Sequence, residues 1–289
     1  MKFNFTRAQS FIVVAIVYVI ASAVGVGAYL LTPELWGFWL RLLLADILAT
    51  VAVFIFSLIF KNASVYDPYW SVQPIVILVS FLIGQKLTPL KLLLFLAVLF
   101  WGVRLTANWA YTFKSLAHED WRYRMLREKT GRFYPIINFV GIHMVPTLVV
   151  YLCTLPAVAV ALSSSKGNVL SYIAIVLCFG AATLQGVSDV QMHRFRKSGK
   201  SGFIRVGLWK NSRHPNYLGE IIMWWGVGIC AVSALGVNYS YLLVGAVANT
   251  MLFLFVSIPM ADGRQSKKEG FAEYKAETRA LLPIPKGKK

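Results

Sequence analysis

The stretch AQSFIVVAIVYVIASAVGVGAYLL, residues 8–31, decides the class of fold. It contains no charged residue and is about as long as the ~20 apolar residues that a transmembrane helix needs. A signal peptide has a shorter apolar region that ends in a small-residue cleavage site. We therefore interpret residues 8–31 as a retained first membrane helix.

Further apolar runs follow, separated by short polar segments. They cover residues 38–60, 71–85, 89–112, 138–163, 167–190, 216–236 and 239–260. The run at 71–85 is short, so the chain predicts seven or eight transmembrane helices. The composition is 57% hydrophobic and 14% charged, against about 25% charged residues in soluble domains. We predict an all-α fold, a polytopic membrane helical bundle that forms one domain over residues 1–289.

Basic residues concentrate in three polar regions. Residues 114–132 carry six Lys and Arg, residues 193–214 carry seven with no acid, and residues 262–289 carry eight. Short loops rich in Lys and Arg stay in the cytoplasm, so we expect all three regions on that face. Eight crossings, which we favour, place the N-terminus there too, whereas seven place it outside. The basic residues interleave with membrane spans, so we expect no nucleic-acid partner.

The acid-free region 193–214 carries more positive charge than membrane orientation requires. This excess indicates an anionic partner, either a phosphate-bearing cofactor or the headgroups of membrane lipids. Residues 264–282 are charged with apolar residues at helical spacing, and we expect a C-terminal interfacial amphipathic helix there. Cys153, Cys178 and Cys230 lie inside apolar runs, so neither a disulfide framework nor a metal site is predicted.

Polar residues near one predicted span form a stripe. Gln185, Asp189, His193 and Arg196 are spaced four, four and three, which places them on one face of a helix. An amide and an acid could bond a carboxamide or a ribose, and a guanidinium could pair with phosphate. The alternative is an ordinary helix end whose acid pairs with a nearby cation.

A second group is RHPNYLGE, residues 213–220. The proline suits the first turn of a helix, and Asn216 and Glu220 then lie one turn apart. Free N–H groups at such a helix start favour an anion. A carboxylate just inside a membrane helix indicates function rather than packing.

Two further groups precede these in the chain. Arg104 and Asn108 lie one turn apart on a predicted span. The loop that follows contains Glu119, Asp120, Arg122 and Tyr123. This group is either functional or a cluster of ion pairs that only stabilises the loop. In YDPYW, residues 66–70, Asp67 is either solvated in a loop or buried. A buried carboxyl has a raised pKa and could donate a proton to a substrate oxygen.

These motifs resemble the steroid 5-alpha-reductase superfamily, most closely its bacterial branch, over roughly residues 60–285. The resemblance rests on QGVSD at 185–189, FRK at 195–197, GLW at 207–209, NYLGE at 216–220 and FAEY at 271–274. Further matches are RLT at 104–106 with Asn108, the acids and Arg122-Tyr123 of the loop, and Asp67 with Trp70. Residues 1–60 are then additional N-terminal helices.

The resemblance implies NADPH as cofactor and an apolar enone as substrate, in a bacterial inner membrane with the cofactor site facing the cytoplasm. It implies cofactor binding by the residues at the matching positions and their neighbours: Arg104, Asn108, Gln185, Asp189, Arg196, Arg205, Arg213, His214, Asn216, Tyr217, Glu220 and Tyr274. Gln185 stands where the superfamily has an asparagine. Asp67 is a loose counterpart of its catalytic glutamate, and the position of its catalytic tyrosine falls near Trp101.

The predicted reaction is hydride transfer to the β-carbon of an activated C=C bond in a lipophilic substrate. Asp67 is the predicted acid, assisted by Tyr66 or Tyr69, because a neutral carboxyl can donate to the developing oxyanion. The motif RHPNY also resembles the isoprenylcysteine carboxyl methyltransferases, which bind S-adenosylmethionine. A membrane methyltransferase and a non-catalytic lipid-binding protein therefore remain the alternatives.

Overall fold

A computed structural model describes residues 5–284. Within this range the chain is built of helices with no strand, apart from an isolated bridge between Ser212 and Arg279. The predicted all-α fold is confirmed. Lys2 and residues 285–289 of the basic region 262–289 lie outside the described residues.

Seven helical stretches among the described residues are long and apolar enough to cross a membrane. They are α1 (Arg7–Leu31), α2 (Phe38–Ile59), α4 (Pro89–Thr112), the run Trp121–Leu162, α8 (Val169–Lys197), α9 (Pro215–Leu235) and the run Val237–Gln265. The first run joins α5 (Trp121–Thr130), η3 (Gly131–Phe133), α6 (Tyr134–Ile137), the π-helix η4 (Asn138–Met144) and α7 (Val145–Leu162). The second joins η6 (Val237–Leu243), α10 (Val244–Leu252), the π-helix η7 (Phe253–Ser257) and α11 (Ile258–Gln265).

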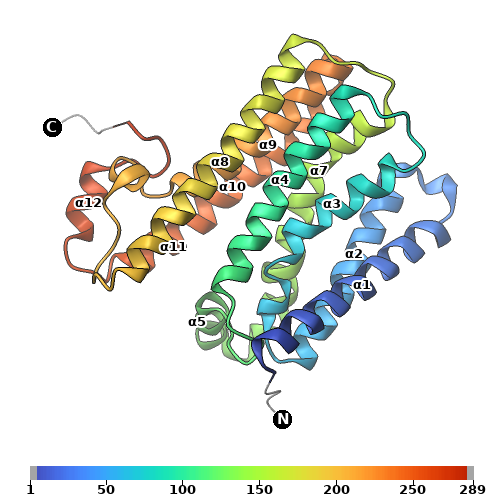
Figure 1. The fold of residues 1–289 in the computed structure, drawn as a ribbon. Coiled ribbons are helices and arrows are strands. Elements are labelled where there is room, and N and C mark those ends of the chain that lie inside the picture. The colour runs from blue at the N-terminus through green and yellow to red at the C-terminus, as the bar shows by residue number, and fades with distance from the viewer. Residues whose placement is uncertain (1–4, 285–289) are drawn as a thin grey trace. The chain divides into compact units, whose positions relative to one another are not determined.

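Shorter helices complete the fold: η1 (Glu34–Trp36), η2 (Ala63–Tyr66), α3 (Tyr69–Leu82), η5 (Gly207–Lys210) and α12 (Phe271–Glu277). The C-terminal helix is present, but it is shorter than the predicted stretch 264–282. The left-handed conformation of Gly270 precedes it, and the backbone is extended from Thr278. Figure 1 labels the helices along the chain. The chain divides into two compact units, unit 1 (Met1–Ile77, Leu105–Tyr151) and unit 2 (Leu78–Arg104, Leu152–Lys289). The single domain over residues 1–289 stays a prediction.

Helix starts follow local sequence signals. Thr6 caps α1 in a reciprocal capping box with Gln9, and Asn168 does the same for α8 with Ser171. Pro215 occupies the first turn of α9, where its missing N–H leaves no unsatisfied donor. These three spans therefore begin close to the predicted residues, whereas the span predicted at 138–163 belongs to a helical run that already begins at Trp121.

In unit 1, the start of α1 lies at the same end as the loop after α4. Arg7 donates to the carbonyl oxygen of Ala110 at 2.8 Å, and the backbone N–H of Leu116 donates to Ser10 Oγ at 3.0 Å. The α2–α3 connector is at this end too, because Asn62 Nδ2 donates to the Leu116 carbonyl at 2.6 Å. α3, whose 14 residues extend about 21 Å, is not among the seven spans, so the eight-crossing alternative stays a prediction.

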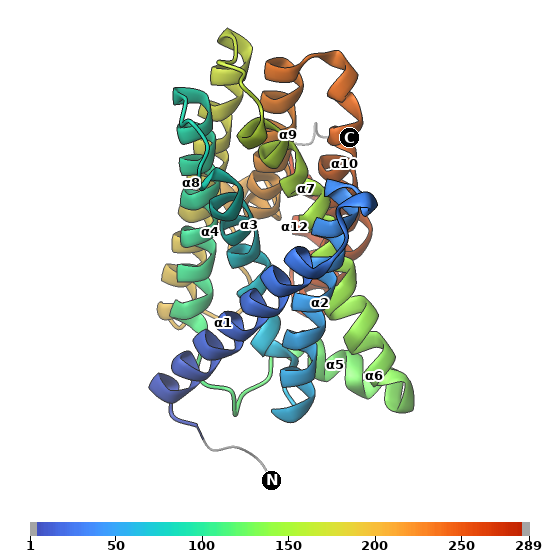
Figure 2. The same cartoon turned by 90° about the vertical axis from the view of Figure 1, so that its right-hand side faces the viewer.

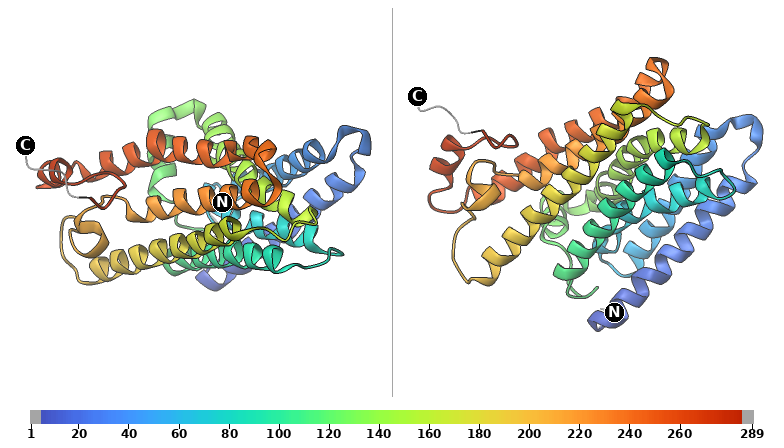
Figure 3. Two further views of the ribbon diagram at one scale, coloured as in Figure 1. Left: turned by 90° about the horizontal axis from the view of Figure 1, so that it is seen from above. Right: turned by 45° about the horizontal axis from the view of Figure 1, so that its top comes forward.

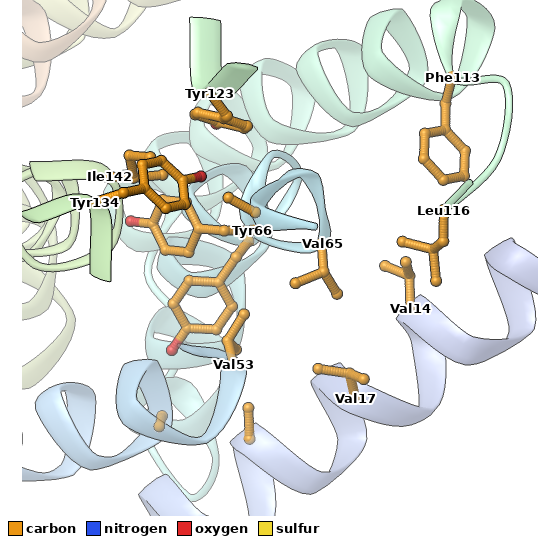
Figure 4. Close-up of a cluster of buried hydrophobic side chains, with 14 residues drawn as sticks. Val14, Val17, Val53, Val65, Tyr66, Phe113, Leu116, Tyr123, Tyr134 and Ile142 are labelled. Carbon is orange, nitrogen blue, oxygen red and sulfur yellow. The ribbon is translucent and has the colours of Figure 1, made fainter. Parts of the chain in front are cut away.

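The core of unit 1 forms where α1 and α2 meet the η2 connector and the loop after α4. Figure 2 shows α1 lying against α2. Figure 4 shows the buried side chains of this core, which include Val14, Val53, Val65, Tyr66 and Phe113. Large apolar side chains elsewhere on these helices face outward, among them Ile12 and Val19 on α1. This outward apolar surface is what a lipid environment requires.

In unit 2, α8 and α9 lie side by side along most of their lengths, as Figure 3 shows. Small residues permit their close approach. A Cβ atom on Gly219 would lie 2.7 Å from the carbonyl oxygen of Ala181, and one on Gly226 would lie 2.6 Å from Cys178 Sγ. Helix pairs in membranes are stabilised by such small-residue interfaces, because lipid provides no hydrophobic force between helices.

The two basic regions of unit 2 lie at one end of it. The backbone N–H groups of Arg213 and His214 donate to the carbonyls of Arg279 and Ala280 at 3.1 and 3.0 Å. At the opposite end, Ser165 Oγ donates to the Ala234 carbonyl at 2.7 Å. Within unit 2, the regions 193–214 and 262–284 therefore share one end, as predicted.

The α8–α9 contact gives a first prediction. Gly219→Ala places a methyl group against the backbone of α8, and we expect it to lower the free energy of unfolding by about 1–3 kcal/mol. Gly180→Ala is the matched control, because a Cβ there meets nothing within 4 Å; better helix propensity should stabilise it slightly. Thermal unfolding in detergent measures both, and equal midpoints for the two variants would contradict this packing.

Candidate functional site

A polar network in unit 2 centres on Arg104 of α4. Its Nη1 donates to Asp189 Oδ2 at 2.8 Å, and its Nη2 donates to Gln185 Oε1. Both charged side chains are mostly buried, at 12% and 14% exposure. The predicted stripe on α8 thus meets the predicted arginine of α4.

Glu220 of α9 belongs to the same network. The indole N–H groups of Trp101 and Trp224 each donate to one of its carboxylate oxygens at 2.8 Å. The side chain is buried, and Arg104 is the cation that attracts it. Two carboxylates therefore surround one buried guanidinium, while Arg196 provides a second positive charge near Asp189.

Two side-chain amides of this network are oriented by their hydrogen bonds. The orientation of Gln185 is fixed, because its oxygen accepts from an arginine that can only donate. Its nitrogen lies within hydrogen-bonding range of the Glu220 carboxylate, so this amide is not free for a ligand. Asn216 bonds Asp189, an acceptor, through its nitrogen, so its Oδ1 is the unpaired atom. A buried acceptor, Asn216 Oδ1, and a buried donor, Arg104 Nε, are thus available to a ligand.

Other predicted cofactor residues form hydrogen bonds and ion pairs with residues of the C-terminal part of the chain. Arg213 donates to Asp262 at 3.1 Å and to the Thr278 carbonyl at 2.6 Å, and His214 Nε2 lies 2.9 Å from Asp262 Oδ1. This buried ion cluster holds the C-terminal segment against the loop before α9. Sequence reasoning missed Asp262, whose only signal is an acid at the end of a predicted span.

Tyr274 completes this attachment. Its hydroxyl donates to the carbonyls of Trp209 and, at 3.3 Å, Ser212. Burial raises its pKa to about 12, so the hydroxyl stays a donor at neutral pH. Tyr217 stacks on the His214 ring at 5.0 Å.

Two predicted cofactor residues, Arg205 and Asn108, are left. Arg205 forms an exposed ion pair with Glu277 at 3.1 Å. Asn108, one turn beyond Arg104 on α4, belongs to unit 1. A cofactor role for these two, and for Arg213, His214, Tyr217 and Tyr274, stays a prediction.

The predicted acid, Asp67, lies in unit 1. It accepts hydrogen bonds from the Tyr123 hydroxyl and, at 3.2 Å, from Arg122 Nη2. Its side chain is 13% exposed, and burial raises its pKa to about 6 despite the lowering effect of Arg122. The structure thus joins Asp67 to the loop residues Arg122 and Tyr123, which the sequence could only place in a separate group.

Tyr66 and Tyr69 flank Asp67 but face inward. The Tyr66 hydroxyl lies 2.8 Å from Thr147 Oγ1, and burial raises the pKa of Tyr66. Both tyrosines are buried, and their rings lie 5.5 Å apart. Their assistance in catalysis stays a prediction.

Sequence reasoning missed three buried polar residues of unit 1. Asp46 is 4% exposed, Gln73 is 5% exposed and His143 is fully buried. Asp46 interrupts the apolar run LRLLLADILATV, residues 40–51. An acid inside a predicted span is itself a signal of function, so Asp46 could have been found. Among residues 5–284, no group of His, Cys, Asp and Glu could hold a metal ion.

A family model described as "Protein of unknown function (DUF1295)" matches residues 53–278. The chain belongs to the DUF1295 family. Uncharacterized protein C594.04c of Schizosaccharomyces pombe is 26% identical over 256 residues, which cover 78% of this chain and 68% of that protein. No solved structure matches the chain. Every predicted site residue lies inside the family match, whereas α1 lies outside it.

The Arg104 network gives a second prediction. Arg104→Met leaves two carboxylates without their buried cation and should lower the free energy of unfolding by about 3–5 kcal/mol. Removing the acid as well, in Arg104→Met with Asp189→Leu, should restore part of this loss. The matched control, Arg205→Met, breaks an exposed pair and should change stability by at most about 1 kcal/mol. Thermal unfolding followed by tryptophan fluorescence distinguishes the variants, and equal losses for both arginines would contradict this network.

Proposed function

We propose that the chain is a membrane-embedded, NADPH-dependent reductase of an activated C=C bond, as in an enone, within a lipophilic substrate of which a steroid is one candidate. The observation that carries the proposal is the pair of buried unpaired atoms, Arg104 Nε and Asn216 Oδ1. One can only donate and the other can only accept. The carboxamide of a nicotinamide ring offers one acceptor and two donors, so it complements both.

The charges around this pair also suit a nucleotide. Arg196 is exposed on the same face of α8 as Asp189, beside the acid-free region 193–214. A guanidinium binds phosphate as a planar fork, and the additional 2′-phosphate of NADPH gives a basic region more contacts than NADH does. By the rule that Lys- and Arg-rich loops stay inside, this end of unit 2 faces the cytoplasm of a bacterial inner membrane.

The proposal places the DUF1295 family beside the steroid 5-alpha-reductase superfamily. It is supported by the contact of Arg104 with Asp189 and by the burial of Glu220, since all three residues lie in motifs that carry the resemblance.

When bound, NADPH supplies the hydride that adds to the β-carbon of the enone. The task of the protein is then to stabilise the negative charge that develops on the carbonyl oxygen. Asp67 is the acid we propose for this oxygen, because burial raises its pKa toward neutrality. Tyr123, its hydrogen-bond donor, is the next candidate.

Cofactor binding tests the proposal directly. NADPH should raise the unfolding temperature of the detergent-purified protein more than NADH or S-adenosylmethionine does, since a ligand at 100 times its dissociation constant adds about 2.7 kcal/mol. Gln185→Leu and Arg196→Met should reduce this shift. Arg194→Met, an exposed cation on the same helix, is the matched control and should retain it.

The outcomes separate the three classes of function. A shift with S-adenosylmethionine alone would establish the methyltransferase alternative. Stabilisation by anionic lipids and by none of the nucleotides would indicate a non-catalytic lipid-binding protein.

Turnover tests the acid. Asp67→Asn should lower NADPH oxidation by about 10²–10³-fold with little change in NADPH affinity, as expected for a lost oxyanion donor. Asp189→Asn and Glu220→Gln should instead weaken cofactor binding. The assay compares enone steroids, prenyl ketones and unsaturated acyl compounds as substrates. Full turnover of Asp67→Asn on an accepted substrate would exclude Asp67.

The pH dependence has a defined sign. Asp67 donates only when protonated, and its pKa is raised to about 6. Turnover should therefore be highest below pH 6 and fall about tenfold per unit above it. The same shift means that the folded state binds this proton more tightly than the unfolded chain, so its stabilising contribution is present at low pH and is lost as the pH rises through 6. The pH–rate profile of Asp67→Asn should lack the fall in turnover above pH 6.

A further inference from the structure

Unit 1 contains a buried polar cluster that the proposed reductase does not use. Asp46 and Thr50 come from α2, Gln73 comes from α3, and His143 and Thr147 come from η4 and α7. All five side chains are buried. Ionisable groups inside membrane helices are costly, so they mark functional sites more often than packing.

Three helical segments converge on this cluster through hydroxyl groups. Thr147 Oγ1 lies 2.8 Å from the Tyr66 hydroxyl and 3.0 Å from Thr50 Oγ1. Tyr69 adds a hydrogen bond to Thr50. On the other side of Tyr66, its ring lies 4.6 Å from the His143 ring. These contacts form one continuous polar interior rather than scattered polar residues.

Several atoms of this interior have no hydrogen-bond partner. The N–H₂ group of Gln73 bonds the Asp46 carboxyl group. Gln73 Oε1 and Asp46 Oδ2 have no partner. His143 Nδ1 lies 2.9 Å from the Asn138 carbonyl, which can only accept, so in the neutral ring Nδ1 carries the proton. His143 Nε2 is then an acceptor, and it too is unpaired. A buried unpaired group costs roughly 1–3 kcal/mol, which a suitable ligand would recover.

We propose that this cluster binds the hydroxyl group of a lipophilic alcohol whose hydrocarbon part lies among the apolar side chains of unit 1. A hydroxyl can donate, so it can satisfy Gln73 Oε1 or His143 Nε2, the unpaired acceptors of this cluster. A ketone or an ether only accepts, and would leave Gln73 Oε1 and His143 Nε2 unpaired. The proposal concerns unit 1 without nucleotide, so it stands or fails independently of the reductase.

Photoaffinity labelling tests this site. The detergent-purified full chain, free of nucleotide, is irradiated with hexadecan-1-ol carrying a diazirine next to the hydroxyl end, and in parallel with the methyl ether of the same probe. We expect the alcohol to label peptides from residues 42–54, 66–78 or 138–150, at least about tenfold more than the ether does. Unlabelled hexadecan-1-ol should compete.

Variants assign the labelling to the cluster. Gln73→Leu removes the unpaired Oε1 together with the amide that bonds Asp46, and labelling should fall about tenfold. Asn249→Leu is the matched control, since it removes a buried amide with an unpaired Nδ2 in unit 2 and should leave labelling unchanged. If Gln73→Leu does not fold, Asp46→Asn takes its place with the same readout. Equal labelling by alcohol and ether, or unchanged labelling of the folded variant, would overturn the proposal and indicate a cluster that water alone satisfies.

Discussion

Gly219 of α9 packs against the backbone of α8 at Ala181, and this contact sets the geometry of the polar groups on both helices. Because a Cβ atom does not fit there, the two helix backbones lie close enough for short side chains to interact across them. Gln185 and Asp189 of α8 thereby reach the same region as Asn216 and Glu220 of α9. The small residues of the interface thus explain why polar groups spaced along two membrane helices form one network.

Charge compensation is the second constraint. A carboxylate within a membrane helix is tolerated only where protein groups replace water. Glu220 accepts hydrogen bonds from two indole N–H groups, and Asp189 pairs with a guanidinium. Both carboxylates therefore have protein partners in place of water. One donor, Arg104 Nε, and one acceptor, Asn216 Oδ1, remain unpaired, and these two atoms are why the network suits a ligand better than it suits packing alone.

The sequence predicts the fold well because lipid imposes a simple rule. Every backbone group must be bonded within the helix, so apolar length alone locates the spans. The stripe of Gln185 and Asp189 was predictable for the same reason, since it depends only on helical spacing. Its partner Arg104 is 85 residues away from Asp189, and no spacing rule gives such a contact.

Other contacts could not be predicted, for particular reasons. Asp262, which pairs with Arg213 and His214, lies on a helix about 50 residues further along the chain. The sequence left Asp67 either solvated in a loop or buried, and only folding brings Arg122 and Tyr123 to it. Asp46 was visible as an acid in an apolar run, but its unpaired neighbours depend on how three segments of unit 1 pack.

The central claim is that the network around Gln185 and Asn216 binds NADPH. Hydrogen–deuterium exchange of the detergent-purified protein, with and without saturating NADPH, tests it most directly because it locates the ligand. The account predicts slower exchange in the segments 185–220 and 97–104, which contain the network residues, and a smaller effect with NADH. Unchanged exchange in these segments at saturating NADPH, or protection confined to unit 1, would contradict it.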